Sequence, residues 1–314
     1  MFNIFQLKNN HLFRINEKEN ISFLKKITWV DIIDSSDAVH KIIKNITLQQ
    51  KLKFFTPKNF NKTKRFLKDE NILYMQSFFF SYNNQKKINN TTVSFTIFDR
   101  CLFTSRQEEC PVFCIHQKYL NTHKLINENA YELLLSLFES KIEDLTNKIE
   151  HIYKILEQLS ITIINKKKID EYEHTLSDLS DLENIGWKIQ INLLDSERAI
   201  KFIINNAQLL KTQQQYANNI LDNIKSLLPH NKYIFHQINA LNQSVMGFIN
   251  IEQNKIIKIF SVIFLPPTLI ASSYGMNFEF MPELQWTFGY PGAVILMILS
   301  SVAPYVYFKY KNWL

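Results

Sequence analysis

Two charge-free runs near the end of the chain decide the fold. The first is IFSVIFLPPTLIASSYGM at residues 259–276, and the second is YPGAVILMILSSVAPYVYF at residues 290–308. Each has about the length that crosses the roughly 30 Å hydrocarbon core of a bilayer as a helix. Two buried core helices are the alternative, but aromatic residues stand where a membrane interface would place them. These residues are Trp286, Tyr290, Tyr305, Tyr307 and Trp313. We therefore predict a membrane-spanning hairpin.

The charges beside the two runs predict its orientation. The connecting segment 277–289 contains Glu279 and Glu283 but no Lys or Arg. Basic residues lie instead before the first run and after the second, at Lys255, Lys258, Lys309 and Lys311. Because basic residues stay on the cytoplasmic side, both termini are expected in the cytoplasm and the acidic loop outside.

Composition excludes several classes of function. The chain has 314 residues, enough for about two domains, but only five glycines. It contains neither G-x-G-x-x-G nor G-x-x-x-x-G-K-[ST], so Rossmann and P-loop nucleotide binding are not expected. The net charge of +7 is spread thinly among many Asn and Ile, which does not indicate a nucleic-acid partner. The eight histidines form no H-x-x-x-H pair, and we predict no enzyme activity and no cofactor.

The three cysteines, Cys101, Cys110 and Cys114, are an odd number in a chain without a secretory segment at its start. They therefore suit a reducing compartment. Cys110, Cys114 and His116 lie close together and are candidate zinc ligands, but the thiol spacing is unusual and no second ligand pair follows. We interpret the cysteines as ordinary core or loop thiols.

Residues 1–125 read as a small α/β domain. Short β-rich runs occupy 27–33 and 72–80, and a further pair at 93–98 and 101–104 is separated by Asp99-Arg100, a candidate two-residue hairpin turn. Helical segments are expected near 37–52 and 62–69.

Residues 126–230 predict long antiparallel helices. One apolar stripe steps by three and four residues, which places it on a single helix face. Its members are Leu135, Phe138, Ile142, Leu145, Ile149, Ile152, Leu156 and Leu159. Further helices are expected at about 170–206 and 208–228. We interpret the stripe as helix-to-helix packing without a ligand.

Pro229-His230-Asn231 is expected to break the helical pattern. A new helix then starts near Asn231 and continues into the first span, so that 231–276 is a stalk and a span in one. The predicted helix is roughly 65 Å long, which exceeds the thickness of a bilayer, so most of the helix must project out of the membrane. An external loop at 277–289, the second span at 290–308 and a basic tail at 309–314 complete the predicted organisation.

A polar stripe follows this last long helix. At about 100° per residue, its members lie within roughly 20° of one line. They are Gln243, Asn250, Asn254, Ser261, Thr268 and Ser272, with Leu265 about 40° away. Ser and Thr alone could simply bond back to the helix, but Gln and Asn on the same line favour a water-filled path. One helix cannot enclose a pore, so several copies are required. Asn277 lies off the stripe, and the helix is therefore expected to end near Gly275.

Two short motifs lie between the predicted spans. Tyr274-Gly275-Met276-Asn277 stands at the end of the first span, and Met281-Pro282-Glu283-Leu284 follows in the loop. In this order they resemble the Gly-Met-Asn signature and the loop motif of the CorA magnesium transporters. Similarity to the enterobacterial branch continues upstream at 248–254, 227–231 and 130–134 and covers nearly the whole chain.

This resemblance implies a funnel-shaped homopentamer in the bacterial inner membrane, with an α/β cytoplasmic domain, a long-helix stalk and two C-terminal transmembrane helices. It also implies passive, potential-driven entry of hydrated Mg²⁺, with Co²⁺ and Ni²⁺ also carried. Mg²⁺ gives up its water reluctantly, so neutral oxygens could bind its hydration shell.

The resemblance assigns roles to particular residues. Gly275, Met276 and Asn277 would form the selectivity site, where Asn277 contacts the metal through water. Glu279 and Glu283 would attract cations to the mouth, and Lys255 and Lys258 would form a basic ring. The pore would be lined by Asn254, Ser261, Leu265, Thr268 and Ser272.

The chain departs from the family pattern in two places. Residues 57–65 are basic where the family is rich in carboxylates, so no regulatory Mg²⁺ site is assigned there, and the run 258–266 is about three residues short. Two alternatives remain open. One is transport of another divalent metal such as Zn²⁺ on the same fold, and the other is a non-conducting membrane scaffold.

Overall fold

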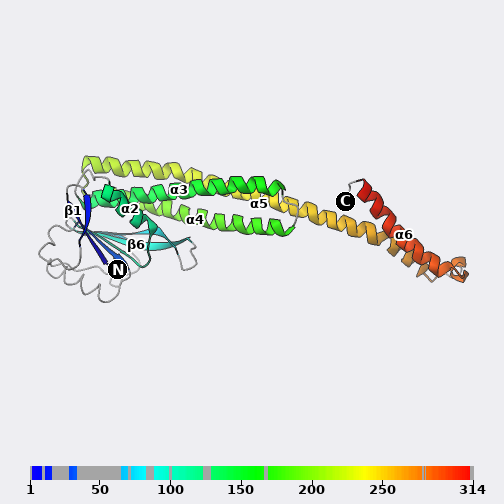
Figure 1. Ribbon diagram of the computed structural model, residues 1–314. Helices are drawn as coiled ribbons and strands as arrows, with labels where there is room; N and C mark the ends of the chain where they lie inside the picture. Colours follow the sequence, from blue (N-terminus) through cyan, green and yellow to red (C-terminus); the bar gives the residue numbers. More distant parts are fainter. Residues whose placement is uncertain are drawn as a thin grey trace. The chain divides into compact units, whose positions relative to one another are not determined.

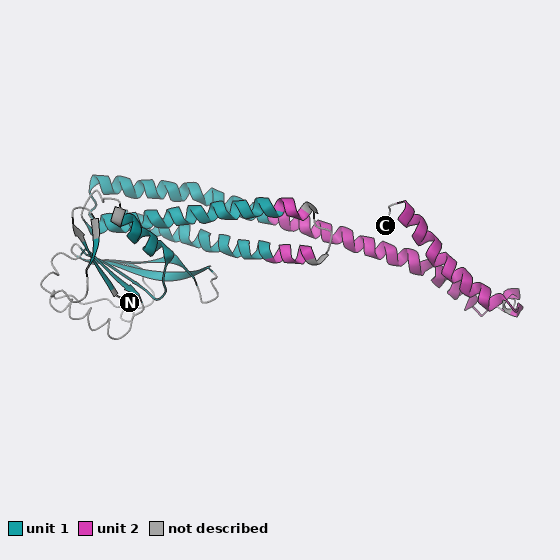
Figure 2. Cartoon of the chain, viewed as in Figure 1, with its two compact units in different colours: residues 1–159, 178–238 teal, residues 160–177, 239–314 magenta. Residues whose placement is uncertain are grey.

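The computed structural model describes residues 2–8, 11–15, 28–33, 65–69, 72–82, 88–98, 101–122, 129–165, 169–277, 279 and 281–311. The chain divides into two compact units (Figure 2). Unit 1 comprises residues 1–159 and 178–238, and unit 2 comprises residues 160–177 and 239–314. The expected helix at 37–52 and the basic segment up to Lys64 lie outside the described residues.

Unit 1 contains a seven-stranded sheet in the order β2-β1-β3-β7-β6-β5-β4. The strands are β1 Phe2–Lys8, β2 His11–Ile15, β3 Trp29–Ile33, β4 Phe66–Asp69, β5 Ile72–Tyr82, β6 Ile88–Phe98 and β7 Cys101–Arg106. Among the strands that the structure describes, β3 and β7 pair in parallel and the other neighbouring pairs are antiparallel. Phe98 pairs with Cys101, which confirms the predicted hairpin between these two strands.

The prediction of a helix at 62–69 was wrong where the structure describes it. Phe66–Asp69 forms β4, an edge strand in which Phe66 pairs with Met75 and Asp69 pairs with Ile72. The four residues gain their partner from a neighbouring strand, so tertiary pairing overrides the local helical pattern. The strands β1 and β2 were not predicted either.

The sheet is followed in the chain by the helices α2 Pro111–Thr122, α3 Ala130–Asn165, α4 Ile169–Asn206 and α5 Lys211–Tyr274 (Figure 1). The apolar stripe of α3 is buried as predicted, with Leu135 and Phe138 at 0% exposure, and only Leu159 is half-exposed. Aromatic side chains join these helices to the sheet, because the Phe79 ring of β5 contacts Phe113 of α2 and Phe138 of α3. Burying such rings is worth about 1.5–3 kcal/mol each and fixes the helices on this face.

The predicted break at Pro229–Asn231 was wrong, because α5 runs through these residues without interruption. Proline costs a helix one hydrogen bond and about 3 kcal/mol. Contacts on both sides offset this cost. The fully buried Asn231 donates to Gln190 Oε1 at 2.8 Å and to Gly186 O at 3.2 Å, and the Tyr153 hydroxyl of α3 donates to His230 O at 2.8 Å.

A buried ion pair lies within the sheet of unit 1. The Arg106 guanidinium of β7 donates to both carboxylate oxygens of Asp31 on the neighbouring parallel strand β3, and both side chains are almost completely buried. Thr104 Oγ1 also donates to Asp31 at 2.7 Å and accepts a hydrogen bond from Trp29 Nε1 at 3.0 Å. The Asp31 carboxylate therefore accepts hydrogen bonds from both Arg106 and Thr104, and these donors replace the water that the buried charge has lost.

Unit 2 contains the end of α3, the start of α4, the second half of α5, the short 3₁₀ helix η2 Pro282–Gln285 and α6 Gly289–Tyr310. The rings of Tyr172 and Phe248 stack at 5.8 Å and bring the start of α4 against α5. Val245 of α5 and Ile163 of α3 are also buried in this unit.

Candidate ion path

The candidate ion path lies in unit 2 and begins on the exposed surface of α5. Of the predicted pore-lining residues, Asn254, Leu265, Thr268 and Ser272 are exposed, and Ser261 is half-exposed. Leu265 keeps 66% of its surface accessible. These side chains are available to a neighbouring copy or to water, but a single chain does not enclose them.

The hydroxyls of this stripe bond within their own helix. Ser261 Oγ donates to Ile257 O at 2.9 Å, and Thr268 Oγ1 donates to Phe264 O at 2.5 Å. This is the local bonding that Ser and Thr adopt in membrane helices. Each hydroxyl oxygen still has lone pairs to accept a hydrogen bond from water. The hydroxyl oxygens of Ser261 and Thr268 can therefore act as acceptors on this side of α5, and the Asn254 amide adds both donors and an acceptor.

The helix α5 ends at Tyr274, which confirms the predicted end near Gly275. Gly275 N donates to Ala271 O at 2.9 Å, and a Cβ at this position would approach the same carbonyl to 3.2 Å. Asn277 follows outside the helix with an exposed side chain. The last carbonyls of a helix carry partial negative charge, which favours a cation at this end. The side-chain oxygen of Asn277 and the carbonyl oxygen of Gly275 are further neutral acceptors at this helix end.

The connecting loop contains both predicted acidic residues and ties Glu283 to the start of α6. Glu279 is exposed, and Glu283 is half-buried in the first turn of η2. Trp286 N donates to Glu283 O at 3.4 Å, and Gly289 N donates to Trp286 O at 3.0 Å. These backbone bonds tie the loop to the first residue of α6.

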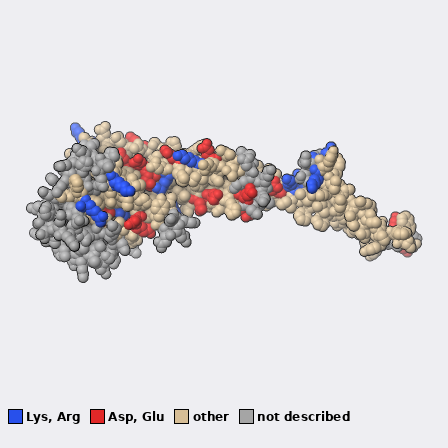
Figure 3. Space-filling model, viewed as in Figure 1, with Lys and Arg blue, Asp and Glu red and all other residues tan. Residues whose placement is uncertain are grey.

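The basic residues of unit 2 lie at the other end of its apolar stretch. Lys255 and Lys258 are exposed on α5, and Lys309 Nζ lies 5.9 Å from the ring centroid of Tyr305 on α6. Figure 3 shows a stretch of these two helices without charged residues, with blue atoms near one end and red atoms near the other. Two helices in the described residues, α5 and α6, have the length and composition to cross a membrane.

Cys110, Cys114 and His116, the candidate zinc ligands, are not arranged as a metal site. Cys110 is buried, and burial raises the pKa of its thiol to about 12, whereas Cys114 is exposed. His116 is fully buried, its Nδ1 lies 2.9 Å from Ser140 Oγ, and burial lowers its pKa to about 3. Among the described residues, no group of three or more His, Cys, Asp or Glu is placed to hold a metal ion.

A protein family described as "CorA-like Mg2+ transporter protein" matches residues 25–310. The chain belongs to this family. A CorA-family relative from Blochmanniella pennsylvanica, named "Magnesium transport protein CorA", is 69% identical over the full length of both chains. A protein of the same name from Escherichia coli is 47% identical, again over the full length of both.

A CorA-family structure also shares the fold of the whole chain. The CorA magnesium transporter from Methanocaldococcus jannaschii superimposes with a TM-score of 0.70 and covers 100% of this chain and 99% of its own, at 15% sequence identity. The structural likeness agrees with the expected α/β domain, long helix and terminal apolar hairpin.

One polar cluster of this CorA-like chain was missed by the sequence analysis. Lys141 received no role, although its helical neighbours Leu137, Phe138 and Leu145 are all apolar and buried. A lysine with apolar, buried residues at three of its four neighbouring helical positions is a signal of a buried amine, although the fourth neighbour is Asp144. It lies in unit 1, away from the predicted ion path along the chain.

Proposed function

We propose that the chain is a channel-type transporter that carries hydrated Mg²⁺ into the cell as a homopentamer. The observation that supports this most directly is the helix end at Tyr274, followed by Gly275, Met276 and Asn277, between two helices that can span a membrane. Full-length relatives named as magnesium transport proteins support the choice of ion.

The selectivity site is built from neutral oxygens. Mg²⁺ is small and dehydrates reluctantly, so a site that binds the hydrated ion must hydrogen-bond to coordinated water. Five copies of the exposed Asn277 side chain and of the Gly275 carbonyl provide acceptors at a helix end with partial negative charge. Carboxylates at the same place would hold the ion too tightly for rapid release.

The remaining groups act on entry and release. Glu279 and Glu283 raise the local cation concentration at the outer mouth, and Lys255 and Lys258 form a basic ring at the cytoplasmic end. Ser261, Thr268, Ser272 and Asn254 line the path, and Leu265 forms its apolar constriction. A divalent cation gains roughly 4.6 kcal/mol over about 100 mV, so the membrane potential suffices as the driving force.

The proposed topology places both termini in the cytoplasm and the loop 277–289 outside the bacterial inner membrane. It rests on lysines at 255, 258, 309 and 311 and on the acidic, lysine-free loop. Co²⁺ and Ni²⁺ are proposed as further cargo, because their hydrated ions share the charge and the octahedral water shell of Mg²⁺.

Ion flux into liposomes tests the proposal. Purified full-length protein is reconstituted around a Mg²⁺-sensitive dye, and an inside-negative potential is imposed. We expect Mg²⁺ influx that falls at least tenfold in Asn277→Ala and remains unchanged in Asn219→Ala, which removes an exposed amide from the cytoplasmic part of α5. The mass of the detergent-solubilised complex reports the number of subunits.

Other outcomes favour the alternatives. Influx of Zn²⁺ without Mg²⁺ influx would identify a transporter of another divalent metal. Assembled oligomers that carry neither ion would identify a scaffold. Mg²⁺ influx that is unaffected by Asn277→Ala would reject the selectivity site while leaving transport intact.

A further inference from the structure

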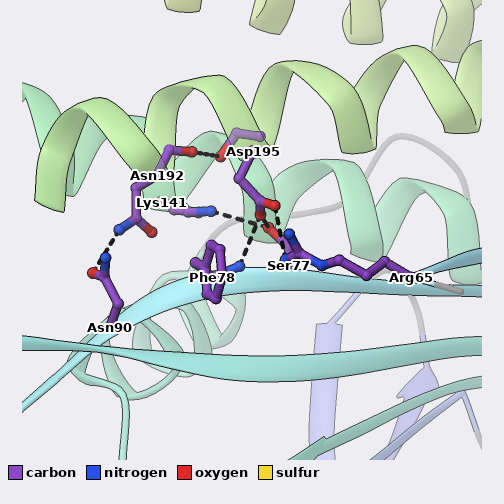
Figure 4. A network of polar contacts seen from close by, with 8 residues as sticks. Arg65, Ser77, Phe78, Asn90, Lys141, Asn192 and Asp195 are labelled. Atoms are coloured by element: carbon purple, nitrogen blue, oxygen red, sulfur yellow. Dashed lines mark hydrogen bonds and ion pairs between the residues drawn. The ribbon is translucent and has the colours of Figure 1, made fainter. Parts of the chain in front are cut away.

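A buried polar network joins the sheet of unit 1 to α3 and α4 (Figure 4). The Asp195 carboxylate of α4 accepts hydrogen bonds from Ser77 Oγ at 2.6 Å and Phe78 N at 2.8 Å, both on β5. Arg65, which precedes β4, places Nη2 2.9 Å from the other carboxylate oxygen. Asp195 is only 5% exposed, so its charge depends on these protein partners.

Lys141 of α3 completes the network from the opposite side. Its Nζ donates to Ser77 Oγ at 3.2 Å, and the residue is 2% exposed. The rest of its surroundings is aromatic, with ring centroids at 4.4 Å for Phe79 and 5.5 Å for Phe138. The side chain thus lies between a serine hydroxyl and two rings.

This environment satisfies a neutral amine better than an ammonium ion. An ammonium group has three N–H donors, and within the described part of the chain Ser77 Oγ is the oxygen that accepts from Nζ. The two rings replace only part of the lost hydration. Burial accordingly lowers the pKa of Lys141 from 10.5 to about 7, although Asp195 opposes this shift.

Three ionisable groups from other segments act on the charge of Lys141: Asp195 of α4, Arg65 before β4 and Cys110 before α2. Asp195 favours the ammonium form, and Arg65 disfavours it. The Cys110 thiol is the third group whose charge would act on Lys141, but burial raises its pKa to about 12 and it stays neutral. Lys141 is therefore a group of this network whose charge can change near neutral pH.

We propose that Lys141, Ser77 and Asp195 form a proton-sensitive clamp that holds α3 and α4 on the sheet more firmly when Lys141 is neutral. When the clamp opens to water, Lys141 recovers its ordinary affinity for protons, so the open state binds more protons than the closed state above neutral pH. Raising the pH then favours the closed state, which binds fewer protons. At lower pH Lys141 is protonated in the closed state as well, and the opening equilibrium no longer depends on pH. Under the proposed topology the clamp lies on the cytoplasmic side.

Hydrogen exchange of the full-length protein in detergent tests the clamp without measuring transport. Mass spectrometry follows peptides that cover β5 and the Asp195 region of α4 at pH 6, 7 and 8, with rates corrected for the intrinsic pH dependence of exchange. We expect the opening equilibrium of the wild type to fall about tenfold from pH 6 to pH 8.

Two variants assign this change to Lys141. Lys141→Met keeps the aliphatic stem but cannot bind a proton, and its corrected exchange should not depend on pH. Lys154→Met removes an exposed lysine from the same helix and should retain the wild-type dependence. Lys141→Gln, which keeps an N–H donor, replaces the methionine variant if the latter does not fold.

A wild-type profile that is flat from pH 6 to pH 8 would overturn the clamp. Equal pH dependence in the wild type and in Lys141→Met would overturn it as well. Neither result bears on Mg²⁺ transport, so failure of the clamp and failure of the proposed function are distinguishable.

Discussion

Replacing Gly289 with alanine tests how tightly the connecting loop 277–289 is tied to α6. A Cβ built on Gly289 would lie 2.2 Å from Glu283 O and 3.4 Å from Glu283 C, both backbone atoms of η2. Because real Cβ contacts stay above 3.0 Å, the two segments would have to separate by at least about 0.8 Å. Overpacking of this kind costs about 1–3 kcal/mol, and no flexible side chain is present to relieve it.

The displaced segment belongs to the proposed outer mouth. The chain of backbone bonds from Glu283 O through Trp286 to Gly289 would be stretched or broken. We therefore expect Gly289→Ala to lower the melting temperature of the purified protein and to reduce Mg²⁺ influx into liposomes several-fold. The loop should remain present but displaced, so some transport should remain.

Gly292 provides a matched control in the first turn of the same helix. A Cβ at Gly292 meets no atom within 4 Å. Alanine is about 1 kcal/mol more favourable than glycine inside a helix, so Gly292→Ala should melt at the same temperature as the wild type or slightly higher. If both variants melt and transport alike, the close approach of Gly289 to Glu283 is not the constraint inferred here.

Three further predictions concern unit 1. Asp31→Asn should destabilise the fold by about 3–5 kcal/mol in a denaturant titration, because Arg106 would remain charged and buried. Replacing both residues with apolar ones should restore most of this loss. An unchanged unfolding midpoint in Asp31→Asn would contradict the prediction. Pro229→Ala should stabilise the protein by up to about 3 kcal/mol in the same titration, because α5 is continuous at this position and alanine is the better helix former. A lower unfolding midpoint would instead indicate that the helix needs a kink at Pro229. The exposed Cys114 should react with maleimide in the native protein, whereas the buried Cys110 should react only after unfolding. Mass spectrometry measures the labelling, and labelling of Cys110 in the native protein would contradict its burial.

Features with a strong local signal were predictable from the sequence. The charge-free runs indicated α5 and α6, and the three- and four-residue spacing from Leu135 to Leu156 identified the buried face of α3. The order of Gly275, Met276 and Asn277 at a helix end was also readable, since a signature motif needs no knowledge of distant contacts. The pore-lining roles of Ser261 and Thr268 remain predictions, because they depend on copies beside this one.

The errors arose where distant partners decide the local structure. Pro229 was expected to end a helix, yet the buried Asn231 bonds to α4 and the exposed His230 carbonyl bonds to Tyr153 of α3, and α5 stays continuous. Phe66–Asp69 was expected to be helical, yet β5 supplies the pairing that makes it a strand. In both cases a local preference of a few kcal/mol competes with contacts that the sequence does not reveal.

The sequence by itself determined the family, the spanning segments and the candidate ion path, because hydrophobic length, charge placement and short motifs act locally. Only the tertiary structure decided the order of the strands, the Asp31–Arg106 pair and the position of Lys141 beside Ser77 and Asp195. These residues are separated by dozens of positions in the chain. Their energetics depend on burial, which exists only once the sheet and the helices have packed together.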